Sequence, residues 1–267
     1  MEKAFNKLVE DVQKAGIYAA EQQNIVSRSI KKDGSILTKT DTELDKLLTG
    51  KIKEYFPNSL IVSEENPLQE QETFHAEWIF TLDPIDGTDS YSQGMPGWCV
   101  AIGILNNNFE PVGAIIYAPR WATETTKGNL ITLMPGGDIK VNSKDLDFPT
   151  HNSTQTDQLM IGSGLHRLFN FSSFTGKIRV SGSAIISIVA ALIHIDVNGS
   201  IIAPCYIWDV AAAHAVIKKA GMNLEYYSGK QIDYRALVNR AKAPDCFISG
   251  SPETLELIRR HFKLINK

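Results

Sequence analysis

Residues 83 to 88 place two carboxylates three positions apart and follow them directly with a glycine and a threonine. Asp83 and Asp86 would repel each other in apolar surroundings, where ionised neighbours are tolerated chiefly when a cation lies between them. If a helix begins after this motif, Gly87 and Thr88 offer an anion unpaired backbone N–H groups and the positive end of the helix dipole. The motif therefore predicts a metal ion and a phosphate at one corner of the fold.

The segment before the motif strengthens this prediction. Residues 77–82 are rich in aromatic and β-branched side chains and are typical of a buried strand. Asp83 would then lie at the carboxyl end of the strand, where open sheets bind their ligands. Two other phosphate chemistries are excluded. The chain has no Gly-x-x-x-x-Gly-Lys-Ser/Thr loop, and Pro84 stands where an Asp-x-Asp nucleophile would be needed.

Composition narrows the class of protein. The chain has 267 residues, 43% of them hydrophobic, which suits one large domain or two modest ones. A net charge of −3 with scattered Lys and Arg residues argues against a nucleic-acid polymer as partner. The three cysteines lack metal-like spacing and are typical of reduced core thiols. The N-terminus has no apolar signal segment, and the longest apolar run, 184–193, is too short to cross a bilayer, so we expect a cytoplasmic protein without a membrane partner.

Apolar periodicity predicts the elements of the first half. One amphipathic helix covers residues 2–22, and a second begins with a capping box of Thr40 and Glu43 and includes Leu47 in its buried stripe. Asp41 would lie in the first turn of this second helix. Strands are expected at 60–63, 78–82, 98–105 and 112–117, the last two as an antiparallel hairpin, and a turn at 135–138 joins a further pair.

The second half alternates strands and helices. A nearly all-apolar helix over 183–194 is expected between two layers. A further helix follows Trp208, ends before Gly221, and carries His214 as a packed or half-exposed residue rather than a ligand. Ser251 and Pro252 begin the final helix as its N-cap and first residue.

We place a boundary between two lobes in the polar stretch 142–157. The predicted fold class is α/β. An N-terminal α+β lobe with an antiparallel sheet covers residues 1–150 and carries most metal ligands, and a C-terminal α/β lobe covers residues 151–267.

Three further acidic residues do not indicate a functional site when each is considered alone. Asp209 follows a tryptophan at a helix start and alone would be read as a helix cap, while Glu64 and Glu65 alone would be solvated loop residues. Together the motifs resemble, in order and spacing, those of the inositol monophosphatase superfamily. They are Thr-Lys-Thr-Asp at 38–41, Ser-Glu-Glu at 63–65, Asp-Pro-Ile-Asp-Gly-Thr at 83–88 and Trp-Asp-Val-Ala-Ala at 208–212.

This resemblance spans nearly the whole chain and implies both a fold and an activity. The family has a layered α/β/α/β/α architecture and comprises magnesium-dependent, often lithium-sensitive phosphatases, hydrolases that act on small phosphate esters. Its members often form homodimers, so a homodimer is an expectation for this chain. The phosphate ester would be hydrolysed by a metal-activated water.

The resemblance also implies roles for individual residues. Glu64, Asp83 and the Ile85 carbonyl look like ligands of one Mg²⁺ ion, and Asp83, Asp86 and Asp209 look like ligands of a second. Four carboxylates and a phosphomonoester would be roughly neutralised by two or three divalent ions. Thr88 would hydrogen-bond the attacking water, oriented by Asp41, while the backbone N–H groups of Gly87 and Thr88 hold the phosphate.

The substrate is less defined than the chemistry. The substrate-lining positions of the family correspond to Ser90, Gly182, Ser183 and Ala184, each of which could equally be a turn or cap residue. Where inositol monophosphatases carry a glutamate that grips inositol hydroxyls, this chain has Ile202.

Three functions stay open at this point. Residues 94–98 resemble monophosphatases of inositol or histidinol phosphate, whereas 112–119 and 207–216 resemble 3′(2′),5′-bisphosphate nucleotidases. The alternatives to an inositol monophosphate-like or sugar or alcohol phosphate substrate are therefore a bisphosphate nucleotide and, in a different class, a non-catalytic sensor that binds metal and phosphate. Lys31 and Lys32 could reach phosphate, although their register against the family motif is off by a residue or more.

Overall fold

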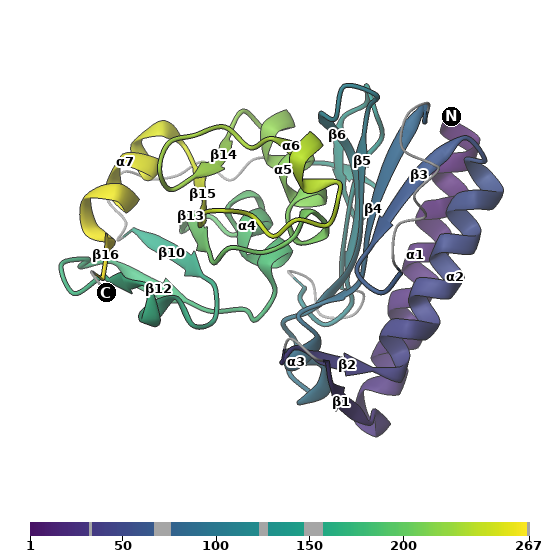
Figure 1. Cartoon of the computed structure of the whole chain (residues 1–267), viewed down its shortest axis with the longest axis horizontal. Coiled ribbons are helices and arrows are strands. Elements are labelled where there is room, and N and C mark those ends of the chain that lie inside the picture. The colour runs from purple at the N-terminus through teal and green to yellow at the C-terminus, as the bar shows by residue number, and fades with distance from the viewer. Residues whose placement is uncertain (32–33, 67–75, 123–127, 147–156, 266–267) are drawn as a thin grey trace.

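The computed structural model describes residues 1–31, 34–66, 76–122, 128–146 and 157–265, and its elements alternate between helical and sheet layers (Figure 1). From right to left in Figure 1, a helix pair covers a large sheet, a second helix pair lies between this sheet and a smaller one, and a last helix covers the outer side. This arrangement confirms the predicted α/β class and the α/β/α/β/α order of layers.

The first layer consists of α1 (Glu2–Gln22) and α2 (Lys39–Tyr55), which bury apolar stripes against the large sheet. The predicted capping box of α2 was wrong. Thr38 is the N-cap and Asp41 the reciprocal partner, because Asp41 Oδ2 accepts a hydrogen bond from the Thr38 N–H at 2.8 Å. Leu47 was also misplaced, since it is 47% exposed.

The large sheet has seven strands whose spatial order follows the sequence. All neighbouring strands are antiparallel except β3 and β4, which are parallel, and the predicted hairpin and the turn at 135–138 are both confirmed. β4 continues to Asp86 instead of ending at Leu82, with a register shift between Asp83 and Asp86. The strands are β3 (Ser59–Ser63), β4 (Trp78–Asp86), β5 (Cys99–Leu105), β6 (Pro111–Ala118), β7 (Asn129–Leu133), β8 (Ile139–Val141) and β9 (Lys144–Asp145).

The middle helices are α4 (Ala184–Ile193) and α5 (Ala211–Lys219). α4 is buried on nearly every side, as predicted, because sheets and α5 surround it. The small sheet has the order β12-β10-β13-β15-β14 and mixes parallel and antiparallel pairs. Its strands are β10 (Gln158–Ile161), β12 (Lys177–Arg179), β13 (Val197–Ile202), β14 (Asn223–Tyr226) and β15 (Phe247–Gly250).

The remaining elements are short, apart from α7 (Pro252–His261), which packs on the outer face of the small sheet and is capped by Ser251 as predicted. They are β1 (Arg28–Ile30), β2 (Ile36–Thr38), α3 (Thr88–Ser92), β11 (Phe169–Asn170), α6 (Tyr234–Leu237), β16 (Lys263–Leu264) and the 3₁₀ turns Gln23–Ile25, Leu165–Arg167 and Ile207–Asp209.

Within the described ranges, none of the helices combines the length and the apolar character needed to span a bilayer. Much of the predicted lobe boundary, 147–156, lies outside the described residues, so the division at residue 150 stays a prediction.

Candidate active site

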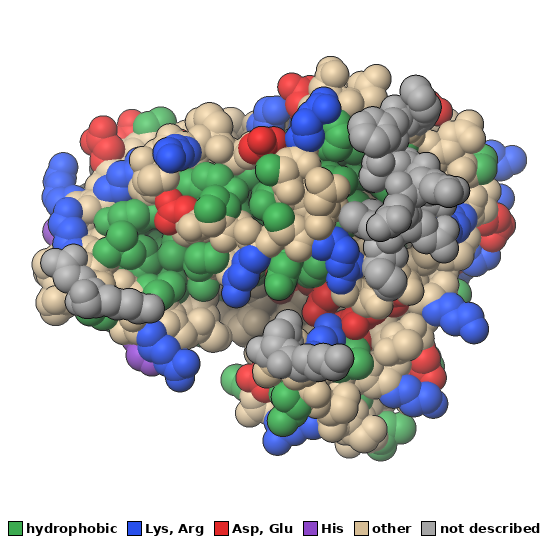
Figure 2. Space-filling model, in the orientation of Figure 1, with side chains coloured by type: hydrophobic (Ala, Val, Ile, Leu, Met, Phe, Trp, Pro, Cys, Tyr) green, Lys and Arg blue, Asp and Glu red, His purple; other side chains and the backbone are tan. Residues whose placement is uncertain are grey.

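The centre of the site is a group of three aspartates contributed by distant parts of the chain. Carboxylate oxygens of Asp83, Asp86 and Asp209 all lie within 4.8 Å of one another. Asp83 and Asp86 belong to the end of β4, and Asp209 closes the 3₁₀ turn in front of α5. In Figure 2, red acidic side chains gather beside the hollow between the two halves of the molecule. The structure thus brings together the two aspartates of one motif and the aspartate of another.

Burial, together with repulsion among the carboxylates, favours the protonated form in this group. Burial and the neighbouring carboxylates Glu64, Asp86 and Asp209 raise the pKa of Asp83 well above its usual range. Burial and neighbouring carboxylates likewise raise the pKa of Asp209. Ionised oxygens this close together fit a hard divalent cation such as Mg²⁺, which prefers carboxylate and carbonyl ligands. Burial also raises the pKa of the nearby Cys99 and Cys205 thiols above the usual range.

Asp86 joins the cluster to the N-terminus of α4. Its carboxylate accepts hydrogen bonds from the Ser183 hydroxyl, from the Ala184 N–H at 3.2 Å and from the Ile185 N–H at 2.7 Å. Burial raises the pKa of Asp86 to about 6, while these hydrogen bonds act in the opposite direction. Ser183 and Ala184, which the sequence suggests as substrate-lining residues, therefore contact a predicted metal ligand.

Asp209 is oriented by its own turn. Its Oδ2 accepts a hydrogen bond from the Tyr206 N–H at 2.6 Å. The ring of the preceding residue, Trp208, stacks on the Tyr206 ring with centroids 4.8 Å apart. The carboxylate thus projects from a turn with little freedom to rotate.

Glu64 follows β3 and lies outside the compact group of three aspartates. Lys31 Nζ contacts the carboxylates of Glu64 and Glu65 at 2.8 and 2.6 Å. Burial raises the pKa of Glu64 to about 7 in spite of this lysine. Lys31 therefore reaches the acidic residues of the site, while Lys32 lies outside the described residues.

Thr88 and Asp41 are adjacent, as their predicted roles require. Thr88 Oγ1 lies 3.1 Å from Asp41 Oδ1 and 2.9 Å from the Ile85 carbonyl oxygen. Because a hydroxyl has one proton, it can donate to only one of these two acceptors at a time. Burial raises the pKa of Asp41 to about 6 although it accepts hydrogen bonds from Thr38.

Two glycines allow the backbone to turn and to approach closely at the corner between β4 and α3. Gly87 is the left-handed N-cap of α3, with φ of 94°, so α3 begins at Thr88. A Cβ on Gly182 would lie 1.9 Å from Ser90 Oγ, which places these two predicted substrate-lining residues against each other. Ser90 is buried.

Two residues near Glu64 had no signal in the sequence motifs. Asp45 on α2 is buried and accepts hydrogen bonds from the Ser63 hydroxyl and the Asn66 side chain. Arg240 donates to backbone carbonyls of the same 63–66 turn. Asp45 lies one helical turn after Asp41 on the same face, a spacing that could have drawn attention to it.

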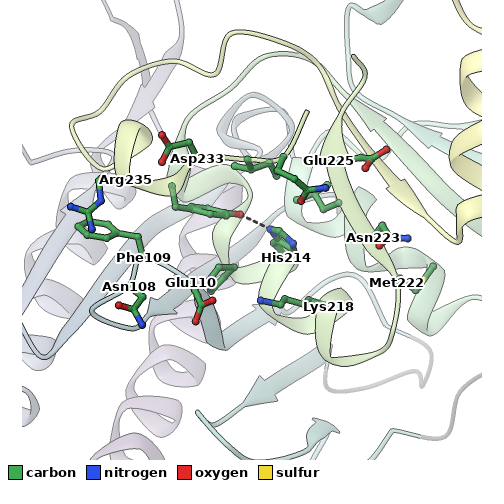
Figure 3. A pocket seen from close by; sticks show the side chains of 15 residues that line it. Asn108, Phe109, Glu110, His214, Lys218, Met222, Asn223, Glu225, Asp233 and Arg235 are labelled. Carbon is green, nitrogen blue, oxygen red and sulfur yellow. Dashed lines mark hydrogen bonds between the residues drawn. The ribbon is translucent and has the colours of Figure 1, made fainter. Parts of the chain in front are cut away.

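A separate cavity of about 380 Å³ lies between the β5–β6 hairpin and α5 (Figure 3). His214 Nδ1 lies 2.9 Å from the Tyr234 hydroxyl at its wall, and burial lowers the pKa of His214 to about 4. None of the three clustered aspartates lines this cavity. His214 is half-buried and hydrogen-bonded to protein, in agreement with its predicted packing role.

Comparison with known proteins gives a consistent family. The sequence model of the "Inositol monophosphatase family" matches residues 3–263. Inositol monophosphatase 1 of Saccharomyces cerevisiae is 24% identical over 218 residues, which cover 73% of this chain and 69% of the yeast protein. Nus factor SuhB of Xylella fastidiosa is 25% identical over 234 residues, covering 84% and 76%.

A solved structure agrees in fold. The Thermotoga maritima IMPase structure superposes with a TM-score of 0.76 at 21% identity, covering 97% of this chain and 98% of the other. At this identity the likeness concerns the architecture, and it agrees with the layers described above.

Proposed function

The chain belongs to the inositol monophosphatase family, and we propose on this basis that it is a Mg²⁺-dependent phosphomonoesterase. Its substrate would be a small phosphorylated metabolite, such as an inositol monophosphate or a sugar or alcohol phosphate. The observation that carries the proposal is the convergence of Asp83, Asp86 and Asp209 within 4.8 Å. Such an arrangement is costly without a bound cation.

The metal would be held by oxygen atoms alone. Glu64, Asp83, Asp86, Asp209 and the Ile85 carbonyl would supply the ligands for two or three Mg²⁺ ions. When bound, Mg²⁺ lowers the pKa of water and stabilises negative charge on the phosphate oxygens and the leaving group.

Thr88 and Asp41 would orient the nucleophilic water. If the Thr88 hydroxyl donates a hydrogen bond to Asp41, its oxygen lone pairs are free to accept a hydrogen bond from that water. The 3.1 Å separation of Thr88 Oγ1 and Asp41 Oδ1 supports this role. The N–H groups of Gly87 and Thr88 would bind the phosphate, and Ser90, Gly182, Ser183 and Ala184 would lie near the substrate.

The substrate class within the family needs a test. Ile202 is buried in β13, so the position that grips inositol hydroxyls elsewhere in the family presents no polar group here. A bisphosphate nucleotide is therefore an alternative substrate. The SuhB relative is named a Nus factor. The second alternative for this chain is therefore a non-catalytic protein that binds metal and phosphate.

Phosphate release in the presence of Mg²⁺ tests these functions together. The panel comprises inositol monophosphates, fructose bisphosphate, histidinol phosphate and adenosine 3′,5′-bisphosphate, compared by kcat/KM. Addition of LiCl against NaCl tests the expected lithium sensitivity. Release from none of these compounds would favour the non-catalytic alternative.

Two matched variants test the site itself. Asp83→Asn should lower kcat/KM by at least about 100-fold, since even outer partners of a metal site can cost that much. The metal-free variant should remain folded, because losing one charge relieves repulsion among the carboxylates. Asp89→Asn is the control, as Asp89 directly follows the same motif but is exposed. Full turnover by Asp83→Asn would refute the assigned roles.

A further inference from the structure

Arg240 reaches from the C-terminal half of the chain to the turn that carries Glu64. Its Nη2 donates a hydrogen bond to the Glu64 carbonyl oxygen at 2.8 Å. Its Nη1 donates to the carbonyl oxygens of Ser63 and Asn66. One side chain therefore fixes the backbone on both sides of Glu64.

The same guanidinium also contacts the turn that carries Asp209. Its Cζ lies 4.7 Å from the centre of the Trp208 ring, and Trp208 directly precedes Asp209. A guanidinium over an indole face is an attractive arrangement. Arg240 thus joins the backbone of one predicted ligand to the neighbour of another, although the two ligands come from opposite halves of the sequence.

These contacts depend on the shape of arginine. A planar guanidinium can donate to several carbonyls in its plane while an aromatic ring covers its face, and a lysine ammonium cannot do both in this way. Arg240 also has a φ of 61°, in the left-handed region that non-glycine residues seldom adopt. The local backbone is therefore held in an uncommon conformation at the residue whose side chain makes these contacts.

The turn is held from its other side as well. Asp45 accepts hydrogen bonds from the side chains of Ser63 and Asn66, so α2 fixes the turn through side chains while Arg240 fixes it through carbonyls. Neither contact uses the Glu64 carboxylate. The backbone of Glu64 is thus immobilised, while its carboxylate contacts Lys31 Nζ at 2.8 Å and would exchange this lysine for a metal ion on binding.

We propose that Arg240 is a positioning residue that sets the spacing of Glu64 and Asp209 for metal binding. This inference rests on the proposed function, because it requires Glu64 to be a ligand. Groups that orient metal ligands typically contribute 10–100-fold to metal affinity. Arg240 should therefore act mainly on the affinity for the ion and only weakly on the chemical step once the ion is bound.

Direct metal binding tests this role. We would measure Mn²⁺ binding by the electron paramagnetic resonance signal of the free ion, and Mg²⁺ binding by calorimetry. Arg240→Lys and Arg240→Gln should each weaken binding by about 10–100-fold. The control is Arg235→Gln. Arg235 on α6 also lies over an aromatic ring of the N-terminal half, that of Phe109 at 4.4 Å, but the proposal gives it no part in positioning a ligand.

Enzyme kinetics and unfolding measurements distinguish a loss of ligand positioning from a general destabilisation of the protein. The Mg²⁺ concentration for half-maximal activity should rise in the Arg240 variants, while kcat at saturating Mg²⁺ stays within a few-fold of the parent. Urea unfolding shows whether each variant is folded, and Arg240→Lys keeps a folded test available if Arg240→Gln is unstable.

A reference variant distinguishes failure of this inference from failure of the proposed function. If Glu64→Gln weakens metal binding while folded Arg240→Lys binds like the parent, the positioning role is wrong and the metal site stands. If Glu64→Gln itself binds metal like the parent, Glu64 is not a ligand and both assignments fall. Equal weakening in Arg235→Gln and the Arg240 variants would also overturn the role, because it would mean a general loss of packing.

Discussion

In the folded protein, the Asp86 carboxylate accepts hydrogen bonds that offset part of the negative charge of the buried acidic cluster. Its carboxylate accepts backbone hydrogen bonds at the start of α4, where the helix dipole favours negative charge. The Ser183 hydroxyl donates to the same carboxylate and accepts from the Ile186 N–H at 3.0 Å. The fold thus compensates part of the charge at Asp86 before any cation binds, while Asp83 receives less such help.

His214 gives a prediction about acid stability. The pKa of this half-buried ring is lowered from 6.5 to about 4, mainly by loss of solvation and secondarily by Lys218. Between these two pH values the unfolded chain binds a proton that the folded chain does not. The free energy of unfolding should therefore fall as pH decreases from 6.5 to 4, by about 1–2 kcal/mol after allowance for the ring's partial contact with solvent.

Urea unfolding at several pH values, compared with His214→Asn, isolates this contribution. Asparagine keeps a polar group near the Nδ1 position but does not titrate. Carboxylates whose pKa is raised, such as Asp41 at about 6, act in the opposite direction, since their stabilisation is lost as pH rises. The difference between parent and variant removes these shared effects. Parallel pH profiles for the two proteins would contradict the prediction.

At the scale of elements, three backbone segments meet without room for side chains. They are the N-cap of α3, the loop before β5 and the loop before α4, and they meet at Gly87, Gly97 and Gly182. A Cβ on Gly97 would lie 1.7 Å from the Ser181 carbonyl oxygen, which is backbone and cannot rotate away. Close approach of these segments is what places Asp86 against the start of α4.

Gly97→Ala should therefore destabilise the protein by about 3 kcal/mol, the upper end of the cost of overpacking. The matched control is Gly50→Ala on the exposed side of α2, where a Cβ would meet no atom within 4 Å. That change should stabilise by about 0.5–1 kcal/mol, because alanine favours a helix interior. Urea unfolding of both variants measures the two effects, and a stable Gly97→Ala would show that the segments can separate.

Local sequence signals were sufficient for most elements. Apolar periodicity located α1, α4 and α7, and β-branched runs located β3 to β6 of the large sheet. The error at the start of α2 arose where two local signals competed. Thr38 with Asp41 and Thr40 with Glu43 are both plausible caps. In the structure the first pair caps the helix, and Thr40 Oγ1 accepts a hydrogen bond from the Tyr91 hydroxyl at 3.2 Å.

The candidate site was predictable only in part. Asp83 and Asp86 lie in one motif, so their proximity follows from local sequence. The position of Asp209 beside them depends on how two sheets pack through α4 and α5, which no local pattern specifies, and its inclusion came from the family resemblance. Arg240 had no signal, because its hydrogen bonds are to backbone carbonyls 174 to 177 residues away.

At the scale of the whole molecule, the predicted ligands belong to different layers. Glu64, Asp83 and Asp86 extend from the large sheet, whereas Asp209 belongs to the turn before α5, a helix that packs between the two sheets. Two cations bound to this set and sharing Asp83 as a ligand would link the two halves of the chain directly. Metal binding should therefore stabilise the junction and not only the loop of one half.

Hydrogen exchange with and without Mg²⁺ measures this link, with NaCl added to equalise ionic strength. At a Mg²⁺ concentration of 100 times its Kd, the free energy of unfolding should rise by about 2.7 kcal/mol. Exchange should slow both in 63–66 and in 207–210, which are far apart in sequence but joined by the ligand set. In Asp209→Asn, protection by Mg²⁺ should persist near 83–88 and disappear at 207–210. If Mg²⁺ protects only the first half in the parent protein, Asp209 does not share the ion, and the junction is held by packing and by Arg240 alone.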